Sequence, residues 1–89
     1  EDVELVQTPS VDDVIIDLRH PSEGEQSPLR LTNNQILQIP FYELRAQIPD
    51  LPGNRQYLLY CDRGTMSRLH AGHLRAEGHE NVKVYVPLV

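Results

Sequence analysis

The sequence predicts an α/β fold with a central, mostly parallel sheet and helices on its faces. The first observation is that four short runs read as strands, and the first of them, 13–19, as one buried on both faces of a parallel sheet. The second is that helix-compatible segments separate the later runs, which gives the alternation of βαβ units. The third is size, since 89 residues with 39% hydrophobic content suit one small core.

The first half of the chain predicts two strands and a loop. Residues 1–10 are acidic and read as a linker or lead-in, so the domain is expected to span 11–89. The run 13–19 is aliphatic between acids and predicts the first buried strand. Residues 20–28 are polar and turn-rich, which predicts a loop, and 35–39 read as the second strand.

The middle of the chain predicts a short helix and a third strand. Residues 41–47 follow a proline and suit a helix that turns Phe41 and Leu44 inward. Two prolines and a glycine within 49–54 end it, and the apolar run 56–60 predicts the third strand.

The last third predicts the longest helix and the final strand. Residues 67–77 lack proline, and Gly78 is placed to cap the helix at its C-terminus. The run 82–86 then reads as a strand. One face of the helix carries four residues at helical spacing: Ser67, His70, Ala71 and Leu74.

Charge and composition exclude several classes of protein. Residues 1–60 carry a net charge of −6 and residues 61–89 a net charge of +1, which argues against a stand-alone nucleic-acid binder. No apolar run is long enough for a membrane span. A single cysteine and no export sequence predict the reducing cytoplasm, and nothing indicates more than a monomer. Because the chain begins at Glu1, we interpret it as a piece of a longer protein.

Cys61 stands where the third strand ends, which is where parallel sheets bind ligands. A turn containing Gly64 follows, and then a helix opens near Ser67. The free N–H groups of a first helical turn, with Arg63 and Arg68 nearby, would stabilise a thiolate. The alternative is a small buried hydrophobe. The arrangement of strand end, glycine turn and helix start favours a nucleophile.

Several segments, in this order, resemble the landmarks of the rhodanese family over nearly the whole chain. The run Arg-Gly-Thr-Met-Ser-Arg (63–68) is the most specific of them, and it is similar to the carboxy-terminal rhodanese domains of tRNA 4-thiouridine sulfurtransferases. The segments are 15–19, 39–44, 57–69 with Cys61, Leu74 with Gly78, and 81–85.

This resemblance implies a three-layer α/β fold and a sulfurtransferase that carries a persulfide on Cys61. The loop amides would stabilise the anionic sulfur, with Arg68 as a possible support and with no cofactor or metal. The loop residues are Asp62, Arg63, Gly64, Thr65, Met66 and Ser67.

The resemblance also implies partners. A cysteine desulfurase would donate the sulfur. The acceptors would be tRNA, for 4-thiouridine, and/or a sulfur-carrier protein for thiazole (thiamine) synthesis, reached through other domains. Resolution of the resulting disulfide would use a second cysteine, which this chain lacks.

Two departures from the family pattern narrow the expected chemistry. Many rhodaneses carry arginine five positions after the cysteine, where this chain has Met66, which suits a protein donor better than thiosulfate. The usual glycine pair after the last strand is also missing.

Three rival functions stay open at this point. A cysteine-dependent phosphatase needs arginine six positions after the cysteine, where Ser67 stands. A non-catalytic rhodanese-like docking module would leave the intact cysteine loop unexplained. A cysteine hydrolase needs a histidine within reach of the thiol.

Four polar residues outside the loop have two interpretations each. His70 and His73 have metal-ligand spacing, but no third ligand is near in sequence, so a packed or solvated role is favoured. Asp17 and Arg19 follow the first strand and would either contact the loop or form a structural ion pair, which we favour.

Overall fold

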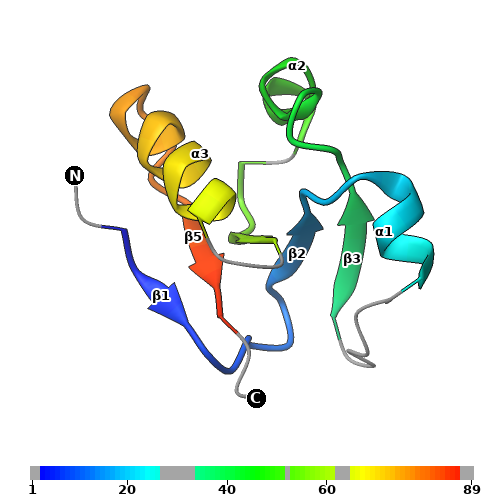
Figure 1. Cartoon of the computed structure of the whole chain (residues 1–89). Coiled ribbons are helices and arrows are strands. Elements are labelled where there is room, and N and C mark those ends of the chain that lie inside the picture. The colour runs from blue at the N-terminus through cyan, green and yellow to red at the C-terminus, as the bar shows by residue number, and fades with distance from the viewer. Residues whose placement is uncertain (1–2, 27–33, 52, 62–64, 87–89) are drawn as a thin grey trace.

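A computed structural model describes residues 3–26, 34–51, 53–61 and 65–86. Its centre is a five-stranded sheet in the order β1-β5-β4-β2-β3, in which every pair is parallel (Figure 1). This confirms the predicted α/β class with a parallel sheet. The strands are β1 Leu5–Val6, β2 Val14–Asp17, β3 Gln35–Gln38, β4 Tyr57–Tyr60 and β5 Val82–Tyr85.

The four strands β2 to β5 coincide with the four aliphatic runs. Strand β2 lies inside the sheet between β3 and β4, and all four of its residues are buried. Burial on both faces explains the continuous run of Val14, Ile15 and Ile16, in place of an alternating pattern, and the last residue, Asp17, is buried in its ion pair with Arg19.

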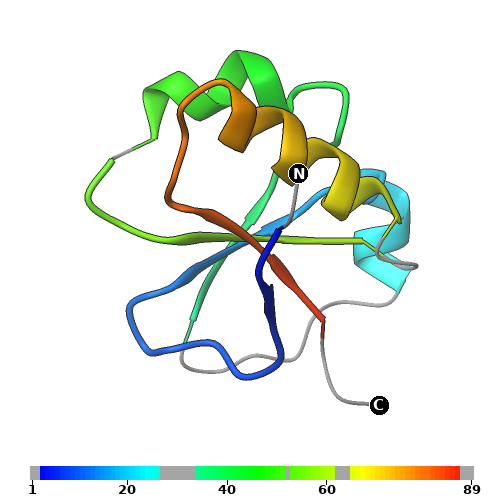
Figure 2. The ribbon, with the colours of Figure 1, turned by 90° about the vertical axis from the view of Figure 1, so that its left-hand side faces the viewer.

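Helices α2 (Leu44–Gln47) and α3 (Thr65–Ala76) lie along the same face of the sheet (Figure 2). A short 3-10 helix, η1 (Ile48–Asp50), continues from α2. The main core forms between these helices and the sheet, and Leu44, Ala71 and Leu74 are its fully buried helical members. The opposite face carries a smaller apolar cluster of Ile15, Leu58 and Tyr85. Within the described residues, no helix is both long and apolar enough to cross a membrane.

The structure corrects the expectation that 20–28 are a loop, because Pro21–Gln26 form helix α1. Proline at the first helical position costs no hydrogen bond, since that N–H has no partner within a helix. The His20 ring accepts the N–H of Ser22 at 3.2 Å, and the His20 carbonyl accepts that of Glu23 at 2.9 Å. These two contacts give hydrogen-bond partners to the N–H groups of Ser22 and Glu23 in the first turn of α1.

Two further differences concern the edges of predicted elements. Residues 5–6, within the expected lead-in, form β1 and pair with β5. The helix expected over 41–47 begins only at Leu44, and Phe41 lies in the turn before it. Phe41 was expected to face inward, but its side chain is 41% exposed.

Helix α3 ends as the sequence predicts. Gly78 has a φ of +104°, the only positive value among the described residues. Its N–H donates to the Arg75 carbonyl at 3.0 Å, and the His79 N–H donates to the Leu74 carbonyl at 3.0 Å. This pair of bonds is the Schellman motif, which needs a left-handed residue at the position of Gly78.

Replacing Gly78 with alanine should lower the free energy of unfolding by about 1 kcal/mol, because a Cβ is strained at positive φ. Gly53→Ala is the matched control, since a Cβ at either position meets nothing within 4 Å and only Gly78 has a positive φ. Urea unfolding of both variants measures the difference. Equal stability of the two variants would contradict the assignment of strain to Gly78.

Candidate functional site

The parallel pairing of β2 with β4 brings two functional segments to one edge of the sheet. Asp17 is in register with Tyr60, and the Leu18 N–H donates to the Tyr60 carbonyl at 2.9 Å. Arg19 is the second residue after β2, and Cys61 is the first residue after β4. The site is therefore at the carboxyl ends of the strands, where parallel sheets bind ligands.

The Cys61 sulfur lies against the first turn of α3. The Ser67 N–H donates to Sγ at 3.3 Å, and Sγ lies 3.5 Å from the Ser67 hydroxyl oxygen. Ser67 is the third residue of α3, so its N–H has no carbonyl partner within the helix. Its side chain is fully buried. The sulfur thus takes the place of a helix cap, in a position that favours negative charge on it.

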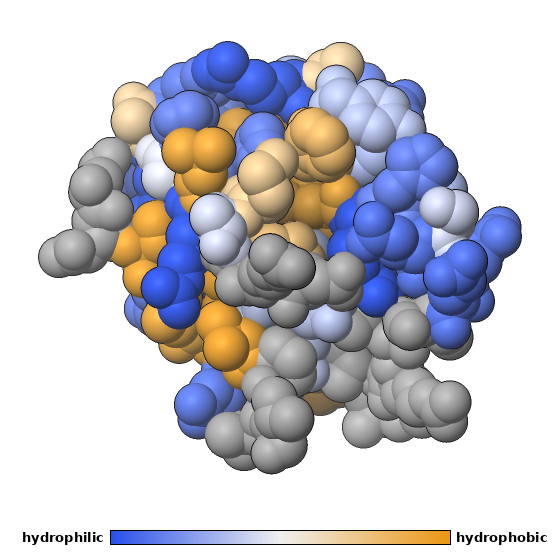
Figure 3. Space-filling view, viewed as in Figure 1, coloured by the Kyte–Doolittle hydropathy of each residue, from blue (hydrophilic) through white to orange (hydrophobic). Residues whose placement is uncertain are grey.

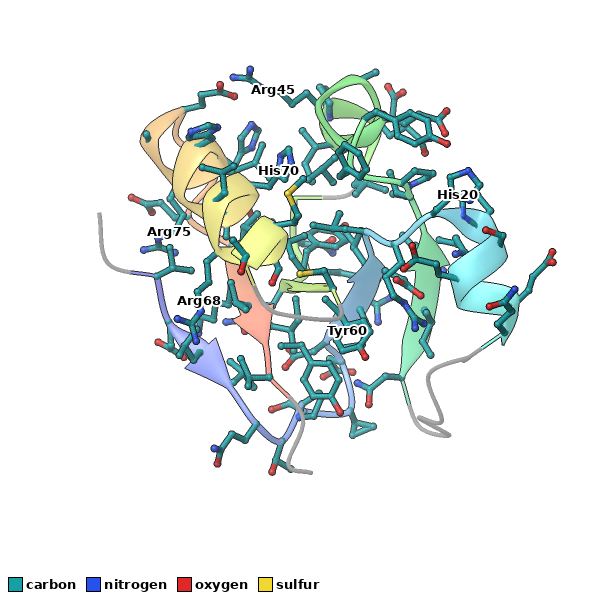
Figure 4. The ribbon with its side chains drawn as sticks, in the orientation of Figure 1. His20, Arg45, Tyr60, Arg68, His70 and Arg75 are labelled. Carbon is teal, nitrogen blue, oxygen red and sulfur yellow. The ribbon has the colours of Figure 1, made fainter. Side chains whose placement is uncertain are left out.

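A cavity of about 390 Å³ opens beside the sulfur. Apolar side chains gather on the surface between α3 and α2, with polar side chains around them (Figure 3). Figure 4 shows His20 on the α1 side of the site and His70 on the α3 side. The cavity is lined by residues from β2 and its following turn, α1, the turn before α2 and α3: Leu18, Arg19, His20, Glu23, Phe41, Cys61, Thr65 and Met66.

Arg19 forms the structural ion pair that was the favoured of the two alternatives. It is buried and forms a two-pronged ion pair, in which Nε donates to Asp17 Oδ1 at 2.9 Å and Nη2 to Oδ2 at 2.8 Å. Its guanidinium carbon lies 5.1 Å from the centre of the Tyr60 ring. The same side chain lines the cavity. The ion pair fixes the guanidinium and balances its charge.

The structure brings together some of the predicted loop residues. Thr65 and Met66 line the cavity, and Ser67 contacts the sulfur. Arg68 is exposed and lies on the side of α3 away from His70 (Figure 4). The remaining predicted residues, Asp62, Arg63 and Gly64, lie outside the described residues.

Four lining residues were not predicted as part of the site: Leu18, His20, Glu23 and Phe41. His20 and Glu23 were not predicted as site residues because the sequence of their segment is typical of a loop. Proline directly after His20, with a glutamate two residues further on, is a pattern of helix starts that could have revealed α1.

The histidines on α3 do not contact the thiol. Neither His70 nor His73 is among the described residues that line the cavity. Burial, with smaller contributions from His73 and Arg45, lowers the pKa of His70 and so disfavours its charged form. Its ring packs 6.2 Å from that of Phe41, which indicates a packing role. Across the described part of the chain, no three His, Cys, Asp or Glu side chains cluster as metal ligands.

Comparison with protein families identifies one match. The family model described as the rhodanese-like domain matches residues 3–86. A protein named tRNA sulfurtransferase from Marinobacter nauticus is 78% identical over all 89 residues. One of the same name from Pseudomonas syringae pv. tomato is 51% identical over 86 residues, 97% of this chain. The chain covers 18% of the length of each of these relatives.

Two solved structures resemble this fold. An NAD-dependent persulfide reductase from A. fulgidus superimposes with a TM-score of 0.72 at 25% identity, covering 93% of this chain and 15% of that protein. A rhodanese-related protein from Thermoplasma volcanium gives a TM-score of 0.66 at 23% identity, covering 83% of this chain and 69% of that one. The second likeness concerns the fold alone.

The Cys61 thiol donates to the Ser67 hydroxyl oxygen at 3.5 Å, and once the thiol ionises the hydroxyl is the group that can donate. Replacing Ser67 with alanine should therefore slow alkylation of Cys61 by iodoacetamide roughly three- to tenfold at neutral pH. The backbone N–H contact remains, so the loss should be partial. Ser10→Ala, an exposed serine distant in sequence, is the control for a lost hydroxyl. An unchanged alkylation rate in Ser67→Ala would show that the hydroxyl does not support the thiolate.

Replacing Asp17 with asparagine should lower the free energy of unfolding by about 3 kcal/mol, because a buried guanidinium is left without its counter-charge. Glu4→Gln is the control, since it breaks the more exposed pair with Lys83, whose atoms are 3.0 Å apart. That change should cost less than about 1 kcal/mol. Urea unfolding measures both, and a similar small loss in each would contradict a structural role for Asp17.

Proposed function

The chain belongs to the rhodanese-like domain family, and we propose from this premise that it is the sulfur-carrying domain of a tRNA sulfurtransferase. Cys61 accepts sulfane sulfur as a persulfide and passes it on. The observation that carries the proposal is the contact between the Cys61 sulfur and the Ser67 N–H, 3.3 Å long, beside a cavity that Cys61 lines. The names of the relatives support the reaction class.

The geometry suits a persulfide because its terminal sulfur is anionic. An anion at a helix N-terminus is stabilised by unpaired N–H groups and by the helix dipole. Cys61 is partly exposed, so a donor can reach it, and the cavity beside it has room for an added sulfur atom. The loop residues 62–67 surround the position in sequence and complete the proposed cradle.

Loading is a sulfur transfer without net oxidation. The Cys61 thiolate attacks the terminal sulfur of a persulfide on the donor, a new S–S bond forms at Cys61, and the donor's S–S bond breaks. The donor cysteine leaves with the electron pair as a thiolate. A cysteine desulfurase, which carries such a persulfide, is the donor we propose, and the reaction takes place in the cytoplasm.

Delivery of the sulfur would use parts of a longer protein. This chain spans about a fifth of the length of its relatives, so binding and activation of an acceptor are assigned to other domains. The acceptors we propose are a tRNA uridine that becomes 4-thiouridine and/or a sulfur-carrier protein for thiazole synthesis. The chain has one cysteine, so a second cysteine elsewhere would resolve the disulfide formed on transfer.

The phosphatase alternative is disfavoured by the position of Ser67. A phosphate-binding arginine would have to stand there, and the residue is instead a fully buried serine in contact with the sulfur. Arg68 is exposed on α3 and does not line the cavity formed by the described residues. A docking module without chemistry would give no reason for a partly exposed thiol at the end of β4.

Incubation with a cysteine desulfurase and radiolabelled cysteine should place one labelled sulfur on the wild-type chain, and a reductant should remove it. Cys61→Ala should carry no label, because no other thiol is present. Ser10→Ala, which keeps the site, is the matched control and should load like the wild type. An unlabelled wild type, or equal label on Cys61→Ala, would contradict the persulfide carrier.

A further inference from the structure

The cavity beside Cys61 carries charge from a residue that the loading reaction does not use. Glu23 lies in the first turn of α1 and lines the cavity. Its side chain is exposed, and within the described residues no hydrogen bond or ion pair engages its carboxylate. The negative charge therefore acts on whatever enters the cavity.

Arg19, the arginine among the described residues that line the cavity, does not offset this charge. Arg19 is held by both oxygens of Asp17, at 2.9 and 2.8 Å, so the two charges of that pair cancel at longer range. Three other lining side chains are apolar: Leu18, Phe41 and Met66. Among the described residues that line the cavity, Glu23 is thus the one whose negative charge has no ion-pair partner.

We propose that Glu23 is a specificity-determining residue that disfavours small anionic sulfur donors at Cys61. The inference rests on the proposed function, since it concerns which donors load the same sulfur. A dianion such as thiosulfate must bring both its charges into the cavity, where a nearby carboxylate repels them. A persulfide presented by a protein places a sulfur with at most a single charge there, so the repulsion is weaker.

Thiosulfate is the probe because its reaction with a thiolate is chemically balanced. The Cys61 thiolate attacks the outer sulfur, the S–S bond of thiosulfate breaks, and sulfite leaves with the electron pair. The product is the same Cys61 persulfide that a desulfurase would form. The mass of the intact chain, increased by one sulfur atom, measures the rate of loading under excess thiosulfate.

Glu23→Gln should increase the second-order rate constant for loading by thiosulfate roughly three- to tenfold at low ionic strength. Glu23→Lys should increase it further. The gain should shrink at high salt, because the interaction of exposed charges is screened. Glu25→Gln is the matched control: Glu25 lies on the same helix and loses the same charge, but does not line the cavity.

Two further measurements separate the possible causes. Alkylation by iodoacetamide, an uncharged reagent, should change by less than twofold in Glu23→Gln, so the effect belongs to the anion and not to general thiol reactivity. Loading from a cysteine desulfurase should rise by a smaller factor in Glu23→Gln than loading by thiosulfate does, because the donated sulfur carries at most one charge. Failure of the wild type to load from the desulfurase would refute the proposed function itself, whatever thiosulfate does.

The inference is overturned if Glu23→Gln and Glu25→Gln load with thiosulfate equally fast. It is also overturned if the rates of alkylation and of thiosulfate loading rise by the same factor in Glu23→Gln. The third contradicting outcome is that neither Glu23→Gln nor Glu23→Lys loads from thiosulfate faster than the wild type. The inference is supported if thiosulfate loading becomes faster only in the Glu23 variants, if alkylation does not, and if salt reduces the increase.

Discussion

The site depends on the parallel register of β2 and β4. Because Asp17 is paired with Tyr60, the residues that follow the two strands emerge side by side at one edge of the sheet. One strand supplies the Asp17–Arg19 pair and the other supplies Cys61. A shift of one residue in this register would turn the buried side chains of β2 to the opposite face, so core packing and the site share one constraint.

Sequence reasoning was most accurate where burial dictates residue type. Strands β2, β4 and β5 were predicted because largely apolar runs are typical of strands buried in a parallel sheet, whereas β3, at the sheet edge, exposes Gln35 and Gln38. The end of α3 was predicted because a glycine after a helix is typical of a left-handed cap. Helix α1 was missed because proline, serine and glycine favour turns. Its first turn depends on His20, whose ring accepts the N–H of Ser22. Strand β1 has two residues and is defined only by its pairing with β5, which the local sequence does not encode.

The same distinction applies to the site. Cys61 and Ser67 were identified because a strand end and a helix start are both local features. The lining residues Glu23 and Phe41 come from segments far from Cys61 in sequence and meet it only through the packing of α1 and the turn before α2. Phe41 was expected in the core, but α2 begins three residues later, and the ring instead lies beside His70 at the cavity.

Ser67 joins the stability of the fold to the chemistry of the sulfur. It is fully buried in the first turn of α3, so the packing of that helix against the sheet fixes its N–H relative to Cys61. A donor held by backbone does not reorganise when charge appears on the sulfur, and that is what makes preorganised dipoles effective. An arginine would add charge but would also attract any small anion. The Ser67 N–H acts at the sulfur itself, and we propose that the side chains lining the cavity select among donors.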